Sequence, residues 1–402
     1  MNDGRSGILG AALLFLLVVV LPAVSATFAD AGVVGRDPIV AISIARSQQE
    51  AKAALEKGLP GAGGRALLVS PHDYLGTLLL PLRKAGLLKE LVVLLPHDNV
   101  LTEGHLEELR GFLGKGGIPE GDRKGLRLED GSIRGAIEGM PVRISTLTAL
   151  MKQEGEFLVV LDTAFLPAVY KNEVKTPMVG LARRLAVTLA DRNVRGKSVV
   201  IFDAVGRADF SLEQGYLAAL LREMFSTPGD FANDLPGKWK ILGAAETAYF
   251  FSQYSDGMVL YKEYLGEAPG DASACYKIAM LAIRDLDVEL ALHWLVKAAE
   301  ADPLYRRAFS EVAGYLFRKE LFEGAERVLL SGLSKAPKDP LLATNLSALY
   351  LARGEAAREA GDAGTAREFF SLAAGVEGAE PEMRERARSL AGTLPAPTPS
   401  PN

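Results

Sequence analysis

Four apolar runs in the first half of the chain each lead into a polar residue. The clearest is residues 157–162, Phe-Leu-Val-Val-Leu-Asp, which has the length of a strand and closes on a carboxylate. Three further runs, residues 66–70, 91–95 and 198–202, are followed by Pro71-His72-Asp73, Pro96-His97-Asp98 and Asp203. Apolar runs without alternation predict strands that are buried on both faces, as in a parallel sheet.

Segments with helical spacing separate these runs. The pattern predicts a first strand at residues 39–44, and helices over 47–59, after residue 73 to about 88, from Thr102 onward, over 147–151, over 177–193, and over 211–225 with Ser211 and Gln214 as a capping box. Strands that alternate with helices predict a doubly wound α/β domain with a mostly parallel sheet, from about residue 36 to 236.

Two glycine-containing segments have a different pattern. Residues 61–64, Gly-Ala-Gly-Gly, precede a strand, whereas a phosphate-binding loop follows one, so we expect a plain turn. Residues 126–141 alternate around Asp130-Gly131 and Glu138-Gly139. This pattern predicts short antiparallel strands with tight turns, placed on the edge of the sheet or over its carboxyl end.

The last third of the chain repeats itself with a period of 34 residues. Ala279, Ala291, Leu295, Ala298 and Pro303 recur as Ala313, Ala325, Leu329, Gly332 and Pro337. A period of 34 is typical of tetratricopeptide repeats, in which small residues let two antiparallel helices approach and the proline ends the second helix. We therefore expect helical repeats over residues 238–392.

A third unit carries Leu346, Ser347 and Tyr350 in register, with its second helix displaced by seven residues to Ala366, Phe370 and Ala373. Seven residues are about two helical turns, so the insertion should lengthen a helix without rotating its apolar face. A degenerate first unit is expected at residues 239–269 and a capping helix near 381–390, followed by a disordered tail at 393–402.

The resemblance to this repeat family implies a concave groove that holds a peptide or a helix of a partner protein. Its positions in this chain are Tyr276, Met280, Ile283, Arg307, Ser310, Phe317 and Arg318. They lack the Lys/Asn arrangement with which some members hold a terminal carboxylate, so an apolar ligand is expected. The alternative is that the chain's own α/β domain fills the groove, because an array of so few repeats needs its edges covered.

The first 26 residues have the pattern of a targeting segment. Arg5 precedes an apolar stretch over residues 8–21, and Val24-Ser25-Ala26 supplies the small residues of a cleavage site. We expect a signal peptide of residues 1–26 and an exported protein of the periplasm or cell envelope. The alternative is an uncleaved anchor, since residues 8–24 approach the length of a membrane-spanning helix.

Composition narrows the range of functions. The 402 residues carry a net charge of −5, which argues against binding to nucleic acid. The single cysteine, Cys275, excludes an intramolecular disulfide and a thiolate metal cluster, and its place in a helical repeat indicates a buried apolar role.

The polar strand ends are the candidate chemical site. Carboxyl ends of parallel strands share one edge of a sheet, so we expect His72, Asp73, His97 and Asp162 to meet there and bind one divalent metal, zinc or manganese. Asp203 would lie nearby as a ligand or general base. The alternative is that these aspartates cap helices and form turns.

This arrangement resembles the α/β hydrolases of the arginase and deacetylase type, which place Asp and His metal ligands at strand ends. Residues 162–165, Asp-Thr-Ala-Phe, are similar to their Asp-x-Asp-Phe, with Ala164 in place of the second carboxylate. Their Asp-x-His-x-Asp run is absent. The resemblance therefore implies a single metal site rather than a two-metal centre.

Two functions remain open at this point. The first is an exported adaptor that binds a partner protein through its repeats and carries an α/β domain related to hydrolases. The second is a metal-dependent hydrolase of amide or related bonds that uses the repeats as a docking arm. The repeat pattern is strong and the metal pattern is incomplete, which narrowly favours the adaptor.

Overall fold

A mostly parallel sheet forms the centre of the N-terminal part of the computed structural model, which describes residues 32–71, 79–97, 99–170, 176–207 and 210–394. The strands are β1 Gly32–Val33, β2 Ile42–Ala45, β3 Arg65–Val69, β4 Glu90–Leu95, β5 Arg127–Glu129, β6 Ser132–Ile137, β7 Met140–Thr146, β8 Glu156–Asp162 and β9 Arg195–Phe202. Their order is β1-β9-β8-β3-β4-β7-β6-β5, and β2 also pairs with β9. The six strands β2, β9, β8, β3, β4 and β7 are parallel neighbours.

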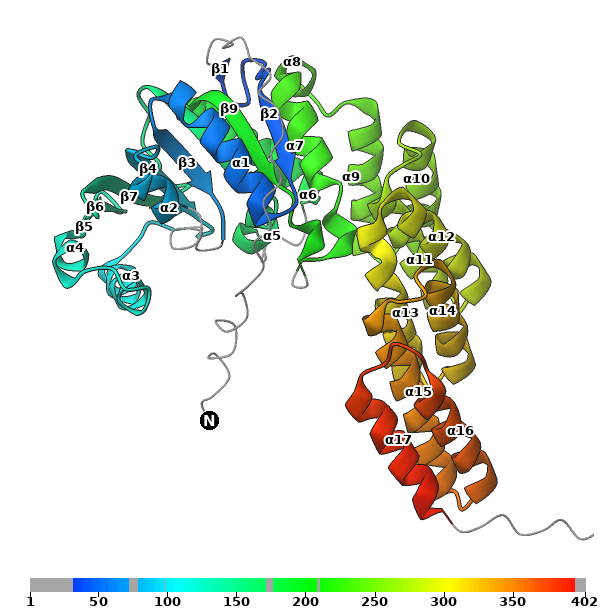
Figure 1. Cartoon of the computed structure of the whole chain (residues 1–402). Helices are drawn as coiled ribbons and strands as arrows, with labels where there is room; N and C mark the ends of the chain where they lie inside the picture. The colour runs from blue at the N-terminus through cyan, green and yellow to red at the C-terminus, as the bar shows by residue number, and fades with distance from the viewer. Residues whose placement is uncertain (1–31, 72–78, 98, 171–175, 208–209, 395–402) are drawn as a thin grey trace, which may run out of the picture.

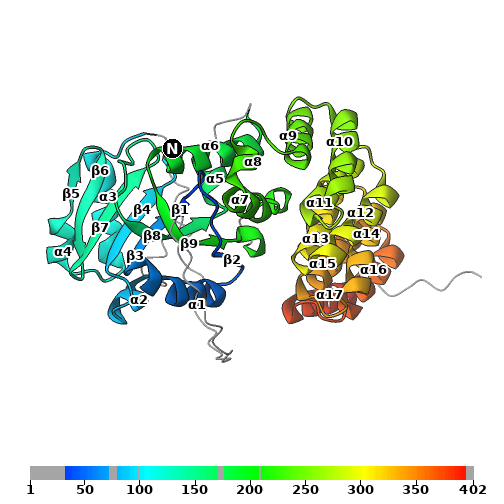
Figure 2. The ribbon, with the colours of Figure 1, turned by 90° about the horizontal axis from the view of Figure 1, so that it is seen from above.

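Helices cover both faces of this sheet (Figure 2). The helices are α1 Gln48–Gly58, α2 Leu80–Lys84, α3 Glu103–Lys115, α4 Glu120–Gly125, α5 Phe165–Val169, α6 Met178–Asp191, α7 Leu217–Ser226 and α8 Pro228–Phe231. One core contains apolar side chains of α1, α2 and α3, and a second contains those of α5, α6 and α7. The buried strands between two helical layers account for the unbroken apolar runs.

The chain changes direction in the sheet between β3 and β8. From β3 it proceeds to β4 on one side, and after β7 it returns to β8 on the other side of β3 and continues to β9. This reversal is the topological switch point of a doubly wound sheet, where loops from opposite faces diverge and ligands commonly bind.

The segment over residues 126–141 lies at the edge of the sheet, which is one of the two positions predicted for it. The antiparallel strands β5, β6 and β7 are joined by tight turns in which Asp130, Gly131, Glu138 and Gly139 have φ values of 50°, 72°, 49° and 74°. Positive φ angles at two consecutive residues are typical of a type I′ turn, whose twist matches that of the flanking strands. Glycine at the second position favours this turn.

Two predicted helices are wrong or incomplete. Residues 147–151 form a turn instead of a helix, because the backbone N–H of Ala149 bonds the Thr146 hydroxyl oxygen. Leu147 and Leu150 are buried in the core from this turn. The helix expected over 211–225 is divided into a 3-10 turn, η4 Leu212–Gln214, and α7. Ser211 caps only the first of these, through the N–H of Glu213.

The C-terminal part is an array of antiparallel helix pairs that extends away from the sheet domain (Figure 1). The pairs are α9 Gly237–Phe250 with α10 Tyr254–Glu267, α11 Ala272–Arg284 with α12 Val288–Ala301, α13 Arg307–Arg318 with α14 Phe322–Lys335, and α15 Pro340–Glu359 with α16 Ala363–Gly375. The short η5 Pro303–Arg306 precedes α13, and α17 Pro381–Thr393 closes the array. This is a tetratricopeptide-type repeat region, as the 34-residue period predicts.

The repeated positions form the seam between the helices of each pair. Ala279, Ala291, Leu295, Ala313, Ala325, Leu329, Ala366, Phe370 and Ala373 are all buried. At Gly332, a Cβ atom would lie 3.0 Å from the side chains of both Leu342 and Phe309, so only a small residue fits there. The small residues that recur every 34 positions therefore mark the places where the packed helices approach most closely.

The seven-residue displacement in the third unit lengthens α15 to 20 residues. Gly354 lies in the added part, and the ring of Phe370 packs so closely on it that a Cβ would be 2.5 Å from a ring carbon. A groove of about 740 Å³ lies between α14 and α16, with Leu330 and Leu372 on its walls. No helix in the described ranges is long and apolar enough to cross a membrane.

Candidate functional sites

The strands that carry the predicted chemical residues are neighbours in the sheet. β3 lies between β4 and β8, and β9 is the next strand beyond β8. At the switch point the hydroxyl of Ser70, at the end of β3, donates a hydrogen bond of 3.2 Å to the Asp162 carboxylate at the end of β8. The topological basis of the predicted site is thus present, with the end of β3 directly beside Asp162.

The Asp162 carboxylate organises the turn that follows β8. It is buried, and its other oxygen accepts the N–H of Ala164 at 2.8 Å. The neighbouring Thr163 hydroxyl accepts the N–H of Ala204 at 3.0 Å, which ties this turn to the end of β9. These contacts match the alternative interpretation, in which a carboxylate after a strand satisfies backbone donors.

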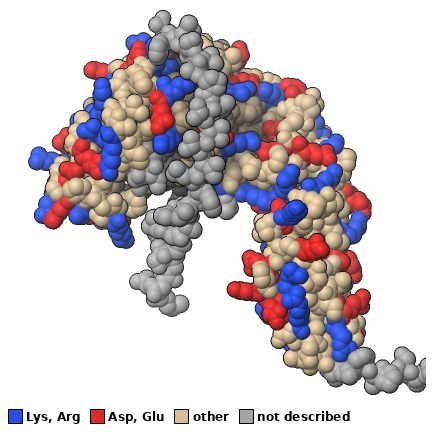
Figure 3. All heavy atoms as spheres, in the orientation of Figure 1, with Lys and Arg blue, Asp and Glu red and all other residues tan. Residues whose placement is uncertain are grey.

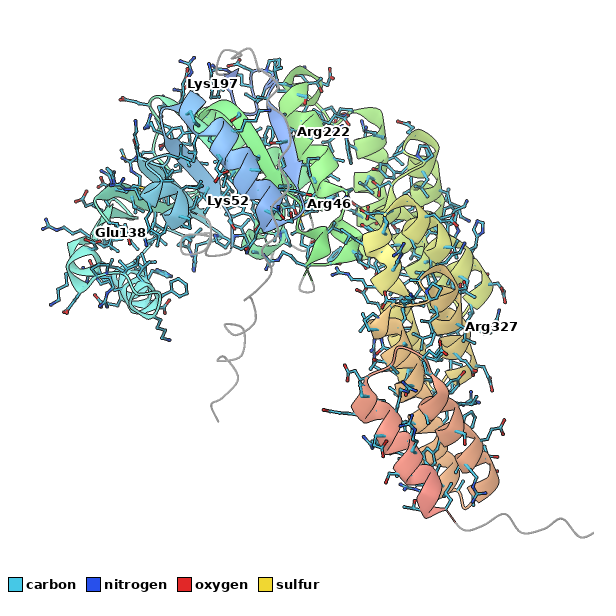
Figure 4. All side chains as sticks on the ribbon, in the orientation of Figure 1. Arg46, Lys52, Glu138, Lys197, Arg222 and Arg327 are labelled. Atoms are coloured by element: carbon cyan, nitrogen blue, oxygen red, sulfur yellow. The ribbon has the colours of Figure 1, made fainter. Side chains whose placement is uncertain are left out.

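Asp203 joins the sheet to the repeats. One of its oxygens caps the short helix η3 Ala204–Gly206 through the N–H of Val205, and the other accepts from Arg46 Nε at 2.9 Å. The same guanidinium reaches Asp302, at the end of α12, at 2.7 Å. Burial raises the pKa of Asp203, and the Val205 N–H and Arg46 oppose that effect. Figure 4 labels Arg46 between the sheet domain and the helical array.

Of the remaining predicted metal ligands, only His97 lies among the described residues. His72 and Asp73 lie outside the described residues, as does Asp98. His97 is exposed, and its ring packs edge-on against His105 with 4.6 Å between the ring centroids. In the part of the chain that the structure describes, no group of three or more His, Cys, Asp or Glu side chains could hold a metal ion. The single-metal site therefore stays a prediction that depends on residues 72 and 73.

The first part of the predicted repeat groove is filled by the chain's own α/β domain. Ile283 is fully buried, and Tyr276 is buried with its hydroxyl bonded to Glu311 at 2.6 Å. The Arg307 guanidinium donates two short hydrogen bonds to the carbonyl oxygens of Arg207 and Phe210. Three of the groove positions predicted to contact a partner are thus engaged internally: Arg307 by the turn after β9, Tyr276 by α13, and Ile283 in the core.

The later part of the groove is open. Phe317 is 38% exposed and Arg318 is also exposed, whereas Met280, in the first part on α11, is half-buried. A cavity of about 300 Å³ opens between α13, α14 and α15, and its lining is Ser310, Ala313, Gly314, Phe317, Ala325, Leu329, Asn345, Ala348 and Leu349. A mostly apolar lining that includes one carboxamide and one hydroxyl suits a peptide segment better than an ion.

A buried polar cluster lies where the two parts meet. The ammonium of Lys277 on α11 lies 2.6 Å from the carboxylate of Glu213 on η4 and 3.4 Å from the centroid of the Tyr249 ring. Burial lowers the pKa of Lys277, and Glu213 opposes that effect. The lysine is only 4% exposed, so its charge is balanced almost entirely within the protein.

Glu246 on α9 belongs to the same junction. It accepts a short hydrogen bond from the Tyr216 hydroxyl and a 3.5 Å bond from the N–H of Val179 at the start of α6. Burial raises the pKa of Glu246 to about 7, and the Tyr216 hydroxyl opposes that effect. A carboxylate of the repeats thus caps a helix of the α/β domain.

These junction residues were missed in the sequence. Their partners are distant along the chain, and neither charge pattern nor period signals them. Burial also raises the pKa of Cys275 to about 11, which fits the predicted apolar role of this buried side chain. Acidic and basic side chains are interspersed on the face shown in Figure 3, so no single-sign surface marks a site there.

No known protein family matches the chain, and no curated protein matches it. Solved structures of repeat proteins are similar to part of it. A thermophilic TPR protein from Thermus thermophilus is 18% identical over 38% of this chain and 98% of its own, with a TM-score of 0.21. YrrB, a TPR protein with an unusual peptide-binding site, is 14% identical over 56% of this chain and 98% of its own, with a TM-score of 0.24. PilF from Pseudomonas aeruginosa is 17% identical over 39% of this chain and 72% of its own, with a TM-score of 0.22.

Proposed function

We propose that the protein is an exported adaptor of the cell envelope that binds an apolar segment of a partner protein in the open part of its repeat groove. The observation that carries this proposal is the division of the groove. Its first part is closed by the α/β domain, whereas α13 and α15 leave an uncovered cavity with Phe317 at its rim. Because the first part of the groove packs against the α/β domain, the open part should keep one orientation relative to that domain.

The chemistry of the cavity selects the partner. Leu329, Leu349 and the Phe317 ring offer apolar contact, and the Asn345 carboxamide offers one acceptor and two donors beside them. A peptide in extended or helical form presents apolar side chains together with backbone N–H and C=O groups. The cavity lining contains no charged side chain among the described residues, which fits the expected apolar ligand.

A steric block of the cavity tests this proposal. Ala348 is a half-buried lining residue on α15, and Ala348→Arg should fill the cavity while leaving the seam intact. Ala356→Arg makes the same change at an exposed position of the same helix. A photo-crosslinking residue at position 345 should capture the same partner in the parent and in Ala356→Arg, and lose it in Ala348→Arg. Equal capture in all three proteins would contradict binding in this cavity.

Export is tested by the mass of the mature protein. Cleavage after Ala26 predicts that the exported chain begins at Thr27. Mass spectrometry of protein recovered from the cell envelope would show this start. A mass that includes residues 1–26 would instead indicate that the segment is retained as an anchor.

A metal-dependent hydrolase is the second candidate, favoured by one observation. The Ser70–Asp162 contact brings the chain just before His72 to the switch point of the sheet. Metal analysis of the purified protein, compared with His72→Ala, tests it. Zinc or manganese in the parent that is lost in the variant, with unchanged folding, would support ligation. Equal metal content in both would eliminate His72 as a ligand.

A further inference from the structure

An open groove lies between α14 and α16, on the side of the array formed by the second helix of each pair (Figure 1). Its volume is about 740 Å³, and it shares no lining residue with the cavity between α13, α14 and α15. Leu330 and Leu372, on its two walls, are 46% and 43% exposed. Leu333, Leu346 and Val376 extend the apolar lining. Apolar side chains that gather in one solvent-open groove are typical of an interaction surface.

The walls of this groove are two helix faces that run in the same direction. α14 and the turn after it line the groove with residues at positions i, i+3, i+4 and i+7, which are Leu330, Leu333, Ser334 and Pro337. α16 lines it with the same spacing, through Glu368, Ser371, Leu372 and Gly375. α15 packs against both helices and contributes Leu346 and Tyr350, which are four residues apart. Residues with this spacing share one face of a helix, so the groove follows the helix axes for about 10 Å.

The charged side chains of the lining are both acidic. They are Glu368 on α16 and Glu377 in the turn after it, and both are exposed. Neither carboxylate forms an ion pair or a side-chain hydrogen bond with another residue that the structure describes. The rim of the groove therefore has two carboxylates whose oxygens are available to a cationic group.

The cations near the groove are bound elsewhere or lie outside it. Arg327 and Lys335 on α14 form ion pairs with carboxylates of α12, on the side of α14 away from α16. Arg353 on α15 pairs with Glu326 at 2.8 Å. Lys338, in the turn after α14, is not part of the lining. Among the described lining residues the groove thus combines an apolar interior with a negative rim and contains no cation.

We propose that this groove binds an amphipathic helix of a partner protein, with apolar side chains toward Leu330 and Leu372 and lysine or arginine toward Glu368 and Glu377. A helix presents apolar residues along one face and bonds its own backbone groups, so it needs no polar partner among the leucines. The complementary charge would favour a basic helix and disfavour an acidic one. This inference does not depend on the proposed function, because the two surfaces have different linings.

Two labelled model peptides test this proposal on the mature protein. Each has about 14 residues, which is about four helical turns. One contains only leucine and lysine in an amphipathic helical pattern, and the other has glutamate in place of every lysine. Fluorescence anisotropy measures the two dissociation constants. The leucine–lysine peptide should bind saturably and about tenfold or more tightly than the leucine–glutamate peptide, because only its charge complements the rim.

Reversal of the two rim charges locates the binding site. Glu368→Lys combined with Glu377→Lys should weaken binding of the leucine–lysine peptide by about tenfold or more and strengthen binding of the leucine–glutamate peptide. Glu359→Lys combined with Glu382→Lys makes the same change in net charge at exposed positions outside the lining. This control should change either dissociation constant by less than about threefold at physiological salt. Equal effects of the two double variants would show attraction by net charge alone and would overturn the proposal.

Leu372→Ser tests the apolar wall. It should melt with the parent, because the side chain is partly exposed, and should bind the leucine–lysine peptide about fivefold or more weakly. Leu330→Ser is a second variant, on the facing wall. Leu286→Ser, at an exposed position in the turn between α11 and α12, is the control and should leave the affinity unchanged.

Three results would overturn the proposal. The first is the absence of saturable binding of the leucine–lysine peptide to the parent protein. The second is an affinity in both folded groove variants, Leu372→Ser and Leu330→Ser, that equals the affinity of the parent. The third is a dimer of the parent protein, seen by sedimentation equilibrium without peptide, that becomes a monomer in Leu372→Ser. That result would make a second copy of this chain the occupant of the groove.

Discussion

The two parts of this molecule bury their polar groups in different ways. In the repeats, burial follows a fixed period, and the seam between helices is almost entirely apolar, with Ala325 and Leu329 as examples. In the α/β domain, the carboxyl edge of the sheet buries Asp162 and Asp203, each satisfied by backbone N–H groups and side chains from other elements. A periodic seam makes a scaffold, whereas the sheet edge concentrates groups that can bind or react.

The junction combines both kinds of burial. The apolar core on the α6 face continues without a break into the repeats, through Tyr216, Trp239 and Tyr264. Polar contacts at Lys277, Glu246 and Arg307 surround it and fix the orientation of the array. Variants that disrupt the seam, the junction, or a single hydrogen bond across the junction should therefore show how much each kind of burial contributes to the free energy of unfolding.

The largest effect is expected in the seam. Ala325 is 1% exposed, and Ala325→Glu would bury a carboxylate without a partner between α13 and α14, at a cost of about 3 kcal/mol or more. Helical signal from the repeats, measured by far-ultraviolet circular dichroism, should be lost first on heating. Ala356→Glu, at an exposed position, is the control. Unchanged melting of Ala325→Glu would show that the 34-residue register is wrong.

The success of the repeat prediction and the gaps in the sheet prediction have a common physical cause. Positions such as Ala291 and Leu295 are set by contacts within one helix pair, which repeat every 34 residues and are visible in the sequence. The strands around residues 157–162 were predictable because each is apolar throughout. Strand order, and so the surroundings of Asp162, depends on the packing of distant segments.

The same reasoning explains the missed contacts. Arg46 lies 157 positions from Asp203, and no local pattern joins them. The groove prediction expected Arg307 and Tyr276 to contact a partner, but only the fold shows that Arg307 bonds the α/β domain and that Tyr276 bonds Glu311.

The junction should respond next. Arg307→Ala removes two charged hydrogen bonds, to the carbonyl oxygens of Arg207 and Phe210, at a cost of about 3 kcal/mol. The neighbouring Arg306 is exposed, so Arg306→Ala should change the free energy of unfolding by less than about 0.5 kcal/mol. Urea unfolding of both variants measures the difference. Equal values would mean that the α/β domain and the repeats are not coupled through Arg307.

A pH dependence should follow from Glu246. Its pKa rises from the usual 4.5 to about 7 on folding, so the folded state holds a proton that the unfolded state releases between these values. The free energy of unfolding should therefore be highest below pH 4.5 and fall as the pH rises through 7, by about 3 kcal/mol from this group.

Glu246→Gln isolates this contribution, because the amide does not titrate and, like the protonated acid, keeps one acceptor oxygen for the Tyr216 hydroxyl. Asp203 also has a raised pKa and contributes a slope of the same sign, but it is present in both proteins. The difference between the parent and Glu246→Gln across urea titrations from pH 4.5 to 8 should shrink or change sign as the pH rises. Parallel curves would show that Glu246 is ionised in the folded protein throughout.

The smallest effect is expected from a single neutral hydrogen bond across the junction. The Tyr305 hydroxyl, on η5, donates to the Leu212 carbonyl at 2.8 Å, and the residue is 2% exposed. Tyr305→Phe keeps the ring in place and leaves the carbonyl without this donor, so the loss should be about 1 kcal/mol. Tyr254→Phe is the matched control, because its hydroxyl bonds the Ser252 hydroxyl at an exposed site and should contribute far less. A larger loss than Arg307→Ala in the same urea titrations would place the main coupling between the two parts at η4 rather than at the turn after β9.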